Sequence, residues 1–190
     1  MTKKFSSMNY MLWEHVSSFE DILDELKKEK DEKKVRRKAC LCLEKTILCV
    51  ETFLNSYVRF CIETDKKLEI HKQKILDEFK TRKPLEYKIK KWPKRLFKKD
   101  VDLSDFKKIK DYYRNPIEHW EQSWETVDAN GVIFLGLDNI EIYDSLSKEK
   151  AFEFYEIMWN TILKILESSN DEDHETNLHK LHYWTGIIKW

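Results

Sequence analysis

Apolar residues recur every three or four positions along much of the chain, and this spacing places them on one face of an α-helix. The pattern is clearest over residues 33–64, where it is formed by Cys40, Leu43, Ile47, Val50, Leu54, Tyr57 and Cys61. Residues 8–29 and 148–167 show the same spacing with a polar opposite face. The sequence therefore predicts three long amphipathic helices.

Shorter helices are predicted between the second and third long ones. Residues 68–80 keep the helical spacing, and residues 84–98 have the pattern of a short helix that is broken near Pro93. Ser104 is a suitable N-cap for a further helix over residues 105–113.

The C-terminal third contains segments of a different character. Residues 131–143 hold two β-rich runs, VIFL and IEIY, on either side of Gly136, and this pattern predicts a small β-hairpin. Residues 168–176 predict a polar, acidic loop, whereas the tail over residues 176–190 is too apolar to be loose. We expect this tail to dock on the body of the protein or on a partner.

Composition favours the same fold. The chain has 190 residues with three glycines and three prolines, and 37% of its residues are charged, which favours long helices and short loops. The prediction is an all-α fold, an up-and-down helical bundle with one small β-hairpin inserted. A single helical domain is expected over residues 1–190, with its core at about 33–167, an N-terminal helix at 8–29 and the docking tail at 176–190.

Location and redox state follow from what the sequence contains. No run of 18 apolar residues occurs, so no membrane span is expected. The first residues lack the apolar core of a signal peptide, and we expect a cytoplasmic protein. All four cysteines fall in one predicted helix, where they are poor disulfide partners, and their spacing matches no zinc motif.

Charge is unevenly distributed along the chain. Residues 66–119 carry 18 basic and 9 acidic side chains, whereas residues 120–175 carry 3 basic and 14 acidic ones. A basic segment can attract a polyanion such as RNA. The two segments can equally pack together and neutralise each other, and charge alone does not decide between these readings.

The segment DYYRNPIEHW has the sequence of a helix start. Asn115 is a favoured N-cap, Pro116 suits the first helical position, and Glu118 completes a capping box. With Asn115 as the N-cap, Arg114 and His119 occupy positions that face each other at the helix N-terminus. An arginine can hold a phosphate and a histidine can transfer a proton near neutral pH, so the segment predicts a phosphate site with an acid–base group.

These residues resemble the signature of a known superfamily. Arg114, followed by Asn115 and then by His119, resembles the R-x4–6-H motif of HEPN proteins. Glu51 and Asn55, within VETFLNSYV on the central helix, are similar to the acid and polar residue that many HEPN proteins carry one turn apart.

The resemblance covers about residues 33–167 and implies a metal-independent endoribonuclease without a cofactor. The 2′-OH of RNA would attack the adjacent phosphate and leave a 2′,3′-cyclic phosphate. Arg114 would hold the phosphate, and His119 would act as base or acid. Asn115 would cap the helix and orient the pair, and Glu51 would position Arg114 or set the His119 tautomer.

The resemblance also implies partners. HEPN motifs meet across a two-fold axis, so a homodimer with a composite site is expected, with RNA as substrate and Asn55 as a substrate-binding residue. Lys110 and Tyr113, a basic and an aromatic residue just before the motif, are predicted to bind the RNA backbone and to stack on its bases. A role in phage defence or a toxin–antitoxin system is implied, with an antitoxin or regulatory protein as partner. Glu121 stands where toxins paired with nucleotidyltransferase antitoxins often carry a tyrosine, which puts that kind of antitoxin in doubt.

Two other functions stay open at this point. The first is a HEPN-like module that binds a nucleotide or a protein without cleaving RNA. The second is a structural helical protein that uses its tail for docking. His174, His179 and His182 could be considered as metal ligands, but no zinc pattern surrounds them, and no metal site is predicted.

Overall fold

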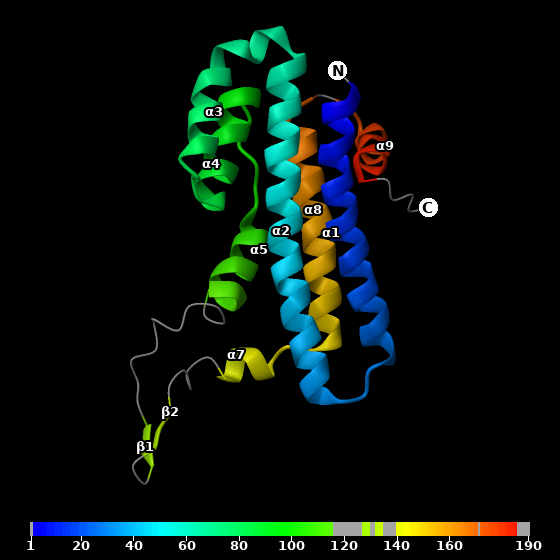
Figure 1. Ribbon diagram of the computed structural model, residues 1–190, viewed down its shortest axis with the longest axis vertical. Helices are drawn as coiled ribbons and strands as arrows, with labels where there is room; N and C mark the ends of the chain where they lie inside the picture. Colours follow the sequence, from blue (N-terminus) through cyan, green and yellow to red (C-terminus); the bar gives the residue numbers. More distant parts are fainter. Residues whose placement is uncertain (1, 116–126, 130–131, 135–139, 171, 186–190) are drawn as a thin grey trace. The chain divides into compact units, whose positions relative to one another are not determined.

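The computed structural model describes residues 2–115, 127–129, 132–134, 140–170 and 172–185. Nearly all of these residues are helical, which confirms the predicted all-α helical bundle (Figure 1). The helices are, in chain order, α1 (Thr2–Lys28), α2 (Glu32–Thr64), η1 (Lys66–His71), α3 (Lys72–Lys80), α4 (Leu85–Phe97), α5 (Ser104–Lys108), η2 (Ile109–Arg114), α7 (Ile140–Asp144), α8 (Lys148–Ser168) and α9 (His174–Thr185).

Backbone contacts divide the chain into two compact units. The first unit joins Met1–Ser17, Leu48–Leu103 and Trp159–Trp190. The second unit joins Ser18–Ile47 and Ser104–Met158. The long helices α1, α2 and α8 each contribute residues to both units.

In the first unit, α3 and α4 form a helical hairpin (Figure 1) that is tied together by one buried carboxylate. Glu78 on α3 accepts hydrogen bonds from Tyr87 Oη at 2.8 Å, Trp92 Nε1 at 2.7 Å and Arg95 Nη1 at 2.8 Å, all on α4. These donors satisfy a carboxylate that burial would otherwise penalise heavily. The rings of Phe79 and Trp92 lie 4.9 Å apart beside it.

The prediction that Pro93 breaks the helix over residues 84–98 was wrong. Helix α4 runs from Leu85 to Phe97 with Pro93 inside it, and Pro93 is buried. A proline removes one backbone donor and crowds the preceding turn, which usually breaks or kinks a helix. Here the buried face formed with Trp92 and Leu96 packs tightly enough to outweigh that penalty.

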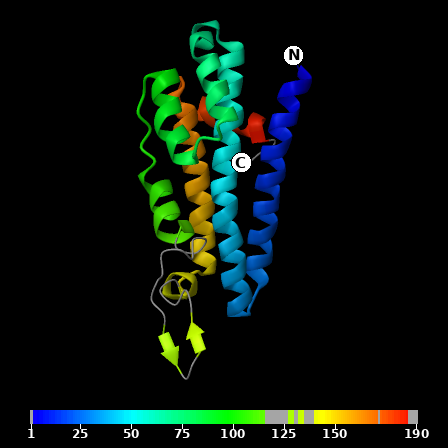
Figure 2. The same ribbon diagram turned by 60° about the vertical axis from the view of Figure 1, so that its left-hand side comes forward.

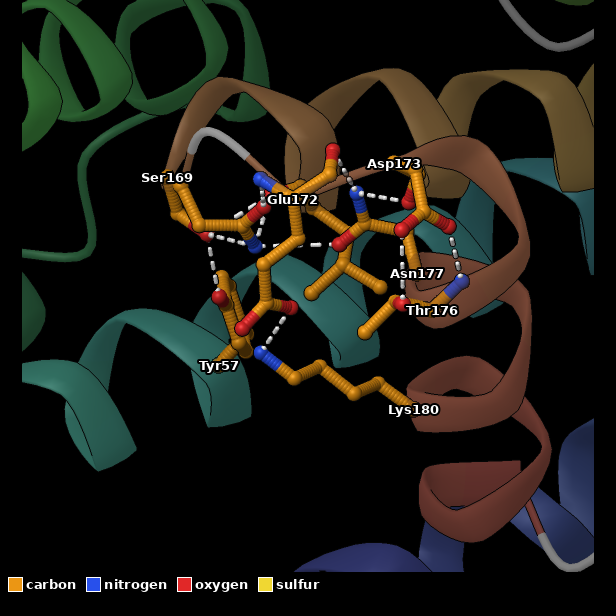
Figure 3. A network of polar contacts seen from close by, with 9 residues as sticks. Tyr57, Ser169, Glu172, Asp173, Thr176, Asn177 and Lys180 are labelled. Atoms are coloured by element: carbon orange, nitrogen blue, oxygen red, sulfur yellow. Dashed lines mark hydrogen bonds and ion pairs between the residues drawn. The ribbon is translucent and has the colours of Figure 1, made fainter.

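The C-terminal helix docks on the first unit, as one of the two predictions for the tail expected. Asn177 and Leu181 of α9 are buried. Asp173 caps the helix by accepting the Thr176 N–H at 2.8 Å, so α9 begins inside the predicted acidic loop (Figure 3). Asn177 Oδ1 also accepts a hydrogen bond from Asn170 Nδ2 at 3.0 Å.

The same polar network attaches the end of α8 to α2. Tyr57 Oη on α2 hydrogen-bonds with the Ser169 hydroxyl, and Lys180 on α9 forms an ion pair with Glu172 (Figure 3). Burial raises the pKa of the Tyr57 phenol well above its usual range, so this hydroxyl stays protonated. The network therefore fixes the turn between α8 and α9.

The second unit has a core shared by α1, α2 and α8. Ala39 and Leu43 of α2 and Phe154 of α8 are buried, and Thr46 Oγ1 donates to the Phe154 carbonyl at 3.2 Å. The edge of the Phe19 ring meets the Tyr155 ring at 5.1 Å. These contacts link the helices that the periodicity predicted as the longest.

The hairpin predicted over residues 131–143 is only partly correct. Two strands, β1 (Val127–Ala129) and β2 (Val132–Phe134), pair antiparallel, so the VIFL run does supply a strand (Figure 2). Its partner lies before it in the sequence rather than after it. The IEIY run instead forms α7, Ile140–Asp144, because β-propensity is a weak preference that context can override.

Candidate functional site

The candidate site begins at a π-helical turn in the second unit. Helix α5 continues into η2, and the Asn115 N–H donates to the Lys110 carbonyl, five residues earlier. Such a turn holds one residue more than an α-helical turn, and π-turns inside helices occur frequently at functional sites. Arg114 is the last residue of this turn, and its Nη1 lies 3.3 Å from Asn115 Oδ1.

The backbone of Asn115 does not have the extended conformation that is typical of an N-cap residue. Its dihedrals, φ −61° and ψ −46°, are α-helical. The preceding helix continues through Arg114 to Asn115 because the π-turn supplies an acceptor for the Asn115 N–H. The side chain of Asn115 accepts from Arg114 and so orients the guanidinium. Residues Pro116 to Trp120 lie outside the described part of the chain.

Tyr113 packs into the second unit rather than standing in solvent. The edge of its ring meets Phe154 at 5.3 Å, and Lys150 Nζ lies over the ring, 5.6 Å from its centroid. The hydrogen bond from Lys150 to Glu153, at 2.6 Å, raises the pKa of this lysine, so it remains a cation. Arg114 therefore follows a residue that is held in place by α8.

Tyr112 is the exposed aromatic side chain beside Arg114. It is 61% exposed, and its ring meets Tyr113 edge-on at 4.9 Å. From the sequence we selected Tyr113 as the substrate-binding residue and did not predict that Tyr112 is the more exposed of the two rings. A signal for it was present: Ile109 and Tyr113 lie four residues apart, on the face that Phe106 also buries, which leaves Tyr112 outside that face.

Lys110 is less accessible than its predicted role as a substrate-binding residue suggests. Its side chain is only 15% exposed, and its Nζ lies 3.6 Å from Asp111 Oδ1. Substrate contact by this lysine would require its head group to reach the surface. Lys150, which the sequence did not single out, places its charge over the Tyr113 ring.

Glu51 and Asn55 lie one turn apart on α2, in the first unit. Glu51 Oε1 accepts a hydrogen bond from Lys88 Nζ at 2.6 Å, and the Lys88 side chain is only 7% exposed. Among the described residues, no group hydrogen-bonds with the buried Oδ1 of Asn55. A buried amide oxygen without a donor is uncommon and suits a residue that waits for a ligand or water.

The structure thus brings four of the predicted site residues together and leaves the rest as predictions. Arg114, Asn115, Lys110 and Tyr113 share one turn of the second unit. Glu51 and Asn55 belong to the first unit, so their association with Arg114 stays a prediction. His119 lies outside the described residues, and its place in the site also stays a prediction.

Within the described ranges, no cluster of three or more His, Cys, Asp or Glu residues could hold a metal ion. None of the described helices has the length and apolarity that crossing a membrane would require. Burial raises the pKa of the Cys42 thiol to about 12, so this cysteine is a poor nucleophile.

Comparison with protein-family models, with curated proteins and with solved structures finds no match to this chain. The resemblance to HEPN proteins therefore rests on the motif residues in the sequence.

Proposed function

We propose that this protein is a metal-independent endoribonuclease of the HEPN type. The observation that carries the proposal is the contact of Arg114 with Asn115 at the end of a π-helical turn, immediately before the segment that contains His119. The contact restricts the guanidinium that would bind phosphate. The all-α fold agrees with the class of protein proposed.

In the proposed reaction, RNA supplies its own nucleophile. A base removes the proton of a 2′-OH, and the 2′-oxygen forms a bond to the adjacent phosphorus. The bond from phosphorus to the 5′-oxygen breaks, and an acid protonates that oxygen. The products are a 2′,3′-cyclic phosphate and a 5′-OH, and Arg114 stabilises the charge on the pentacoordinate phosphate.

Base and acid must stand on opposite sides of the phosphorus, and one imidazole cannot do both at once. We therefore propose a homodimer in which His119 of each protomer contributes one of these groups. Asn115 orients Arg114 through the hydrogen bond described above. Glu51 and Asn55 remain predicted members of the site, and Glu51 Oε1 accepts a hydrogen bond from Lys88. Sedimentation of the purified protein measures the dimer directly.

Cleavage in the presence of EDTA is the direct test of the reaction. Purified protein is expected to cut labelled single-stranded RNA with EDTA present and to leave a 2′,3′-cyclic phosphate. The matched substrate carries a single 2′-deoxy nucleotide at the cleavage position, and cleavage there should stop because the nucleophile is missing. Cleavage of that substrate at an undiminished rate would contradict the mechanism.

A non-cleaving HEPN-like module is the second candidate function. The observation that favours it is the 2.6 Å ion pair of Glu51 with Lys88, which already engages the acid proposed to support Arg114. Binding of a nucleotide or RNA without any cleavage in the EDTA assay would select this function. The biological context proposed for the endoribonuclease is phage defence or a toxin–antitoxin pair in the cytoplasm, with an antitoxin or regulatory protein as partner.

Replacing the exposed Tyr112 with alanine is expected to weaken RNA binding by about tenfold or more. An aromatic side chain that stacks on a base contributes about 1–3 kcal/mol, and Tyr112 is the exposed ring beside Arg114. Fluorescence anisotropy with labelled RNA measures the change in Kd, and Tyr112→Phe should retain binding because it keeps the ring.

Tyr113→Ala provides the matched comparison. This substitution removes the contacts to Phe154 and Lys150, so it should mainly lower the melting temperature. If Tyr112→Ala instead destabilised the fold and left Kd unchanged, Tyr112 would have no part in binding RNA.

A further inference from the structure

Residues 66–99 form the most basic described surface, and we call them the basic hairpin. They comprise η1, α3, α4 and the residues next to these helices, and they carry 14 Lys or Arg and 4 Asp or Glu side chains. All of them belong to the first unit. The charge is therefore concentrated on one helical hairpin.

Ion pairing neutralises only part of this charge. Arg95 binds the buried Glu78, and Lys88 binds Glu51 from a largely buried position. Two exposed lysines have nearby acids, Lys80 with Asp77 at 3.9 Å and Lys94 with Asp100 at 3.0 Å. The acidic partners of these four cations lie in or beside the hairpin or on α2.

Three further lysines are exposed without an acidic partner among the described residues. Lys74 lies on α3, and Lys90 and Lys91 lie on the outer face of α4. Lys94 lies four residues after Lys90 and three after Lys91, and Lys98 lies one turn beyond Lys94. All four lysines therefore lie along the same face of the helix. The result is a row of ammonium groups along about 12 Å of helix.

Two of these lysines and Arg95 lie near His71, where η1 meets the end of α4. Burial lowers the pKa of His71, and the nearby charges of Lys98, Arg95 and Lys74 lower it further. His71 is therefore neutral at physiological pH, in a place where positive charges accumulate. Like charges held this close repel one another, and an anionic ligand would relieve that repulsion.

The shape of the hairpin selects the kind of anion. The apolar side of α4 is already buried: Trp92 is fully covered, and Leu96 is 5% exposed. An amphipathic helix that lies on a membrane needs exposed large apolar groups beside its lysines. Among the described residues of the hairpin, Ile70 is the exposed large apolar side chain. Repeated cations on a rigid face suit the regularly spaced phosphates of a nucleic acid.

We propose that the basic hairpin is an RNA-binding surface that holds the phosphate backbone of a single strand. The choice of RNA rests on the proposed function, whereas the binding of a polyanion rests on the charges of the hairpin alone. The contacts are electrostatic and carry no sequence preference, and they add affinity for the substrate without taking part in the chemical step.

The test is the charge reversal Lys74→Glu/Lys90→Glu/Lys91→Glu. Binding of labelled single-stranded RNA is measured by anisotropy in EDTA over a range of salt concentrations. The triple variant is expected to bind at least about tenfold more weakly, and the slope of log K against log salt should fall by about 2, because each phosphate contact contributes about 0.7. Lys30→Glu/Lys33→Glu/Lys34→Glu is the control, with the same change in net charge at exposed lysines of the second unit.

The outcomes separate this proposal from the proposed function. Loss of binding only in the hairpin variant supports the surface, even if no protein in the series cleaves RNA. Equal weakening in both triple variants would overturn it, because net charge alone would then explain the effect. Binding of phosphatidylserine vesicles without binding of RNA would also overturn it. The neutral variant Lys74→Gln/Lys90→Gln/Lys91→Gln, whose fold is checked by circular dichroism, tests whether misfolding rather than loss of charge explains a loss of binding.

Discussion

Replacement of His119 with alanine is expected to lower the rate of RNA cleavage by about 10²–10⁴-fold, the range that general acid–base groups contribute. The composite site makes the loss severe, because one substitution removes the acid and the base of each site in the homodimer together. Single-turnover cleavage of labelled RNA in EDTA measures the chemical step separately from binding.

His179→Ala is the matched control, because His179 is exposed on α9. It should cleave RNA at the wild-type rate, and both variants should bind RNA as the wild type does. A His119→Ala protein that cleaves as fast as His179→Ala would show that the nuclease lies elsewhere, and the assignment of the HEPN motif would be withdrawn.

Substitution of Arg114 provides a second test of the same site. Arg114→Ala should reduce cleavage by about 10²–10³-fold, which is typical for loss of one group that stabilises developing charge. Arg114→Lys keeps the charge but loses the planar fork that meets both Asn115 and phosphate, so it should recover little activity. The exposed Arg37, replaced with alanine, provides the control for loss of an arginine.

The long helices could be predicted from the sequence because their periodicity is averaged over many residues. The helix predicted over 33–64 is Glu32–Thr64, and the helix predicted over 148–167 is Lys148–Ser168. The secondary-structure prediction was wrong where it relied on the intrinsic preference of one residue or one short run. Pro93 was expected to break α4, and the β-rich run at residues 140–143 was expected to form a strand. In both places the surrounding context outweighs the intrinsic preference.

The candidate site was predictable only where its members are close in sequence. Arg114 and Asn115 are adjacent, and the structure joins them by a hydrogen bond. Lys88 is 37 residues from Glu51, and nothing in the spacing of either residue indicates that they pair. The π-turn was also missed, because a change of hydrogen-bond register by one residue leaves no mark on hydrophobic periodicity.

Outside the candidate site, the pairing of α3 with α4 depends on a buried residue that hydrophobic periodicity does not predict to be buried. Glu78 lies on the short helix α3, and a glutamate is normally expected to face solvent. Its side chain is nevertheless only 7% exposed, and it accepts hydrogen bonds from Tyr87, Trp92 and Arg95. The hairpin is therefore held by a charge whose loss would leave buried donors unsatisfied.

Glu78→Ala is accordingly expected to lower the free energy of unfolding by about 3–5 kcal/mol, the loss seen when one partner of a buried ion pair is removed. Urea denaturation followed by circular dichroism measures it. Glu63→Ala removes a carboxylate from an ion pair with Arg59 in which both side chains are 42% exposed. This control should lose no more than about 1 kcal/mol. Equal effects of the two substitutions would contradict the role assigned to Glu78.

The pH dependence gives the prediction a second, independent readout. Burial alone would raise the pKa of Glu78, but the hydrogen bonds from Arg95, Tyr87 and Trp92 outweigh burial and hold this pKa below its ordinary value of 4.5. A depressed pKa in the folded state stabilises the fold above the pKa of the unfolded chain, and that stabilisation is lost as the pH falls through the folded-state pKa. The difference in unfolding free energy between wild type and Glu78→Ala should therefore be constant around neutral pH and shrink below about pH 4.5. A difference that stays constant into acid would mean that packing of the side chain, rather than its charge, holds the hairpin together.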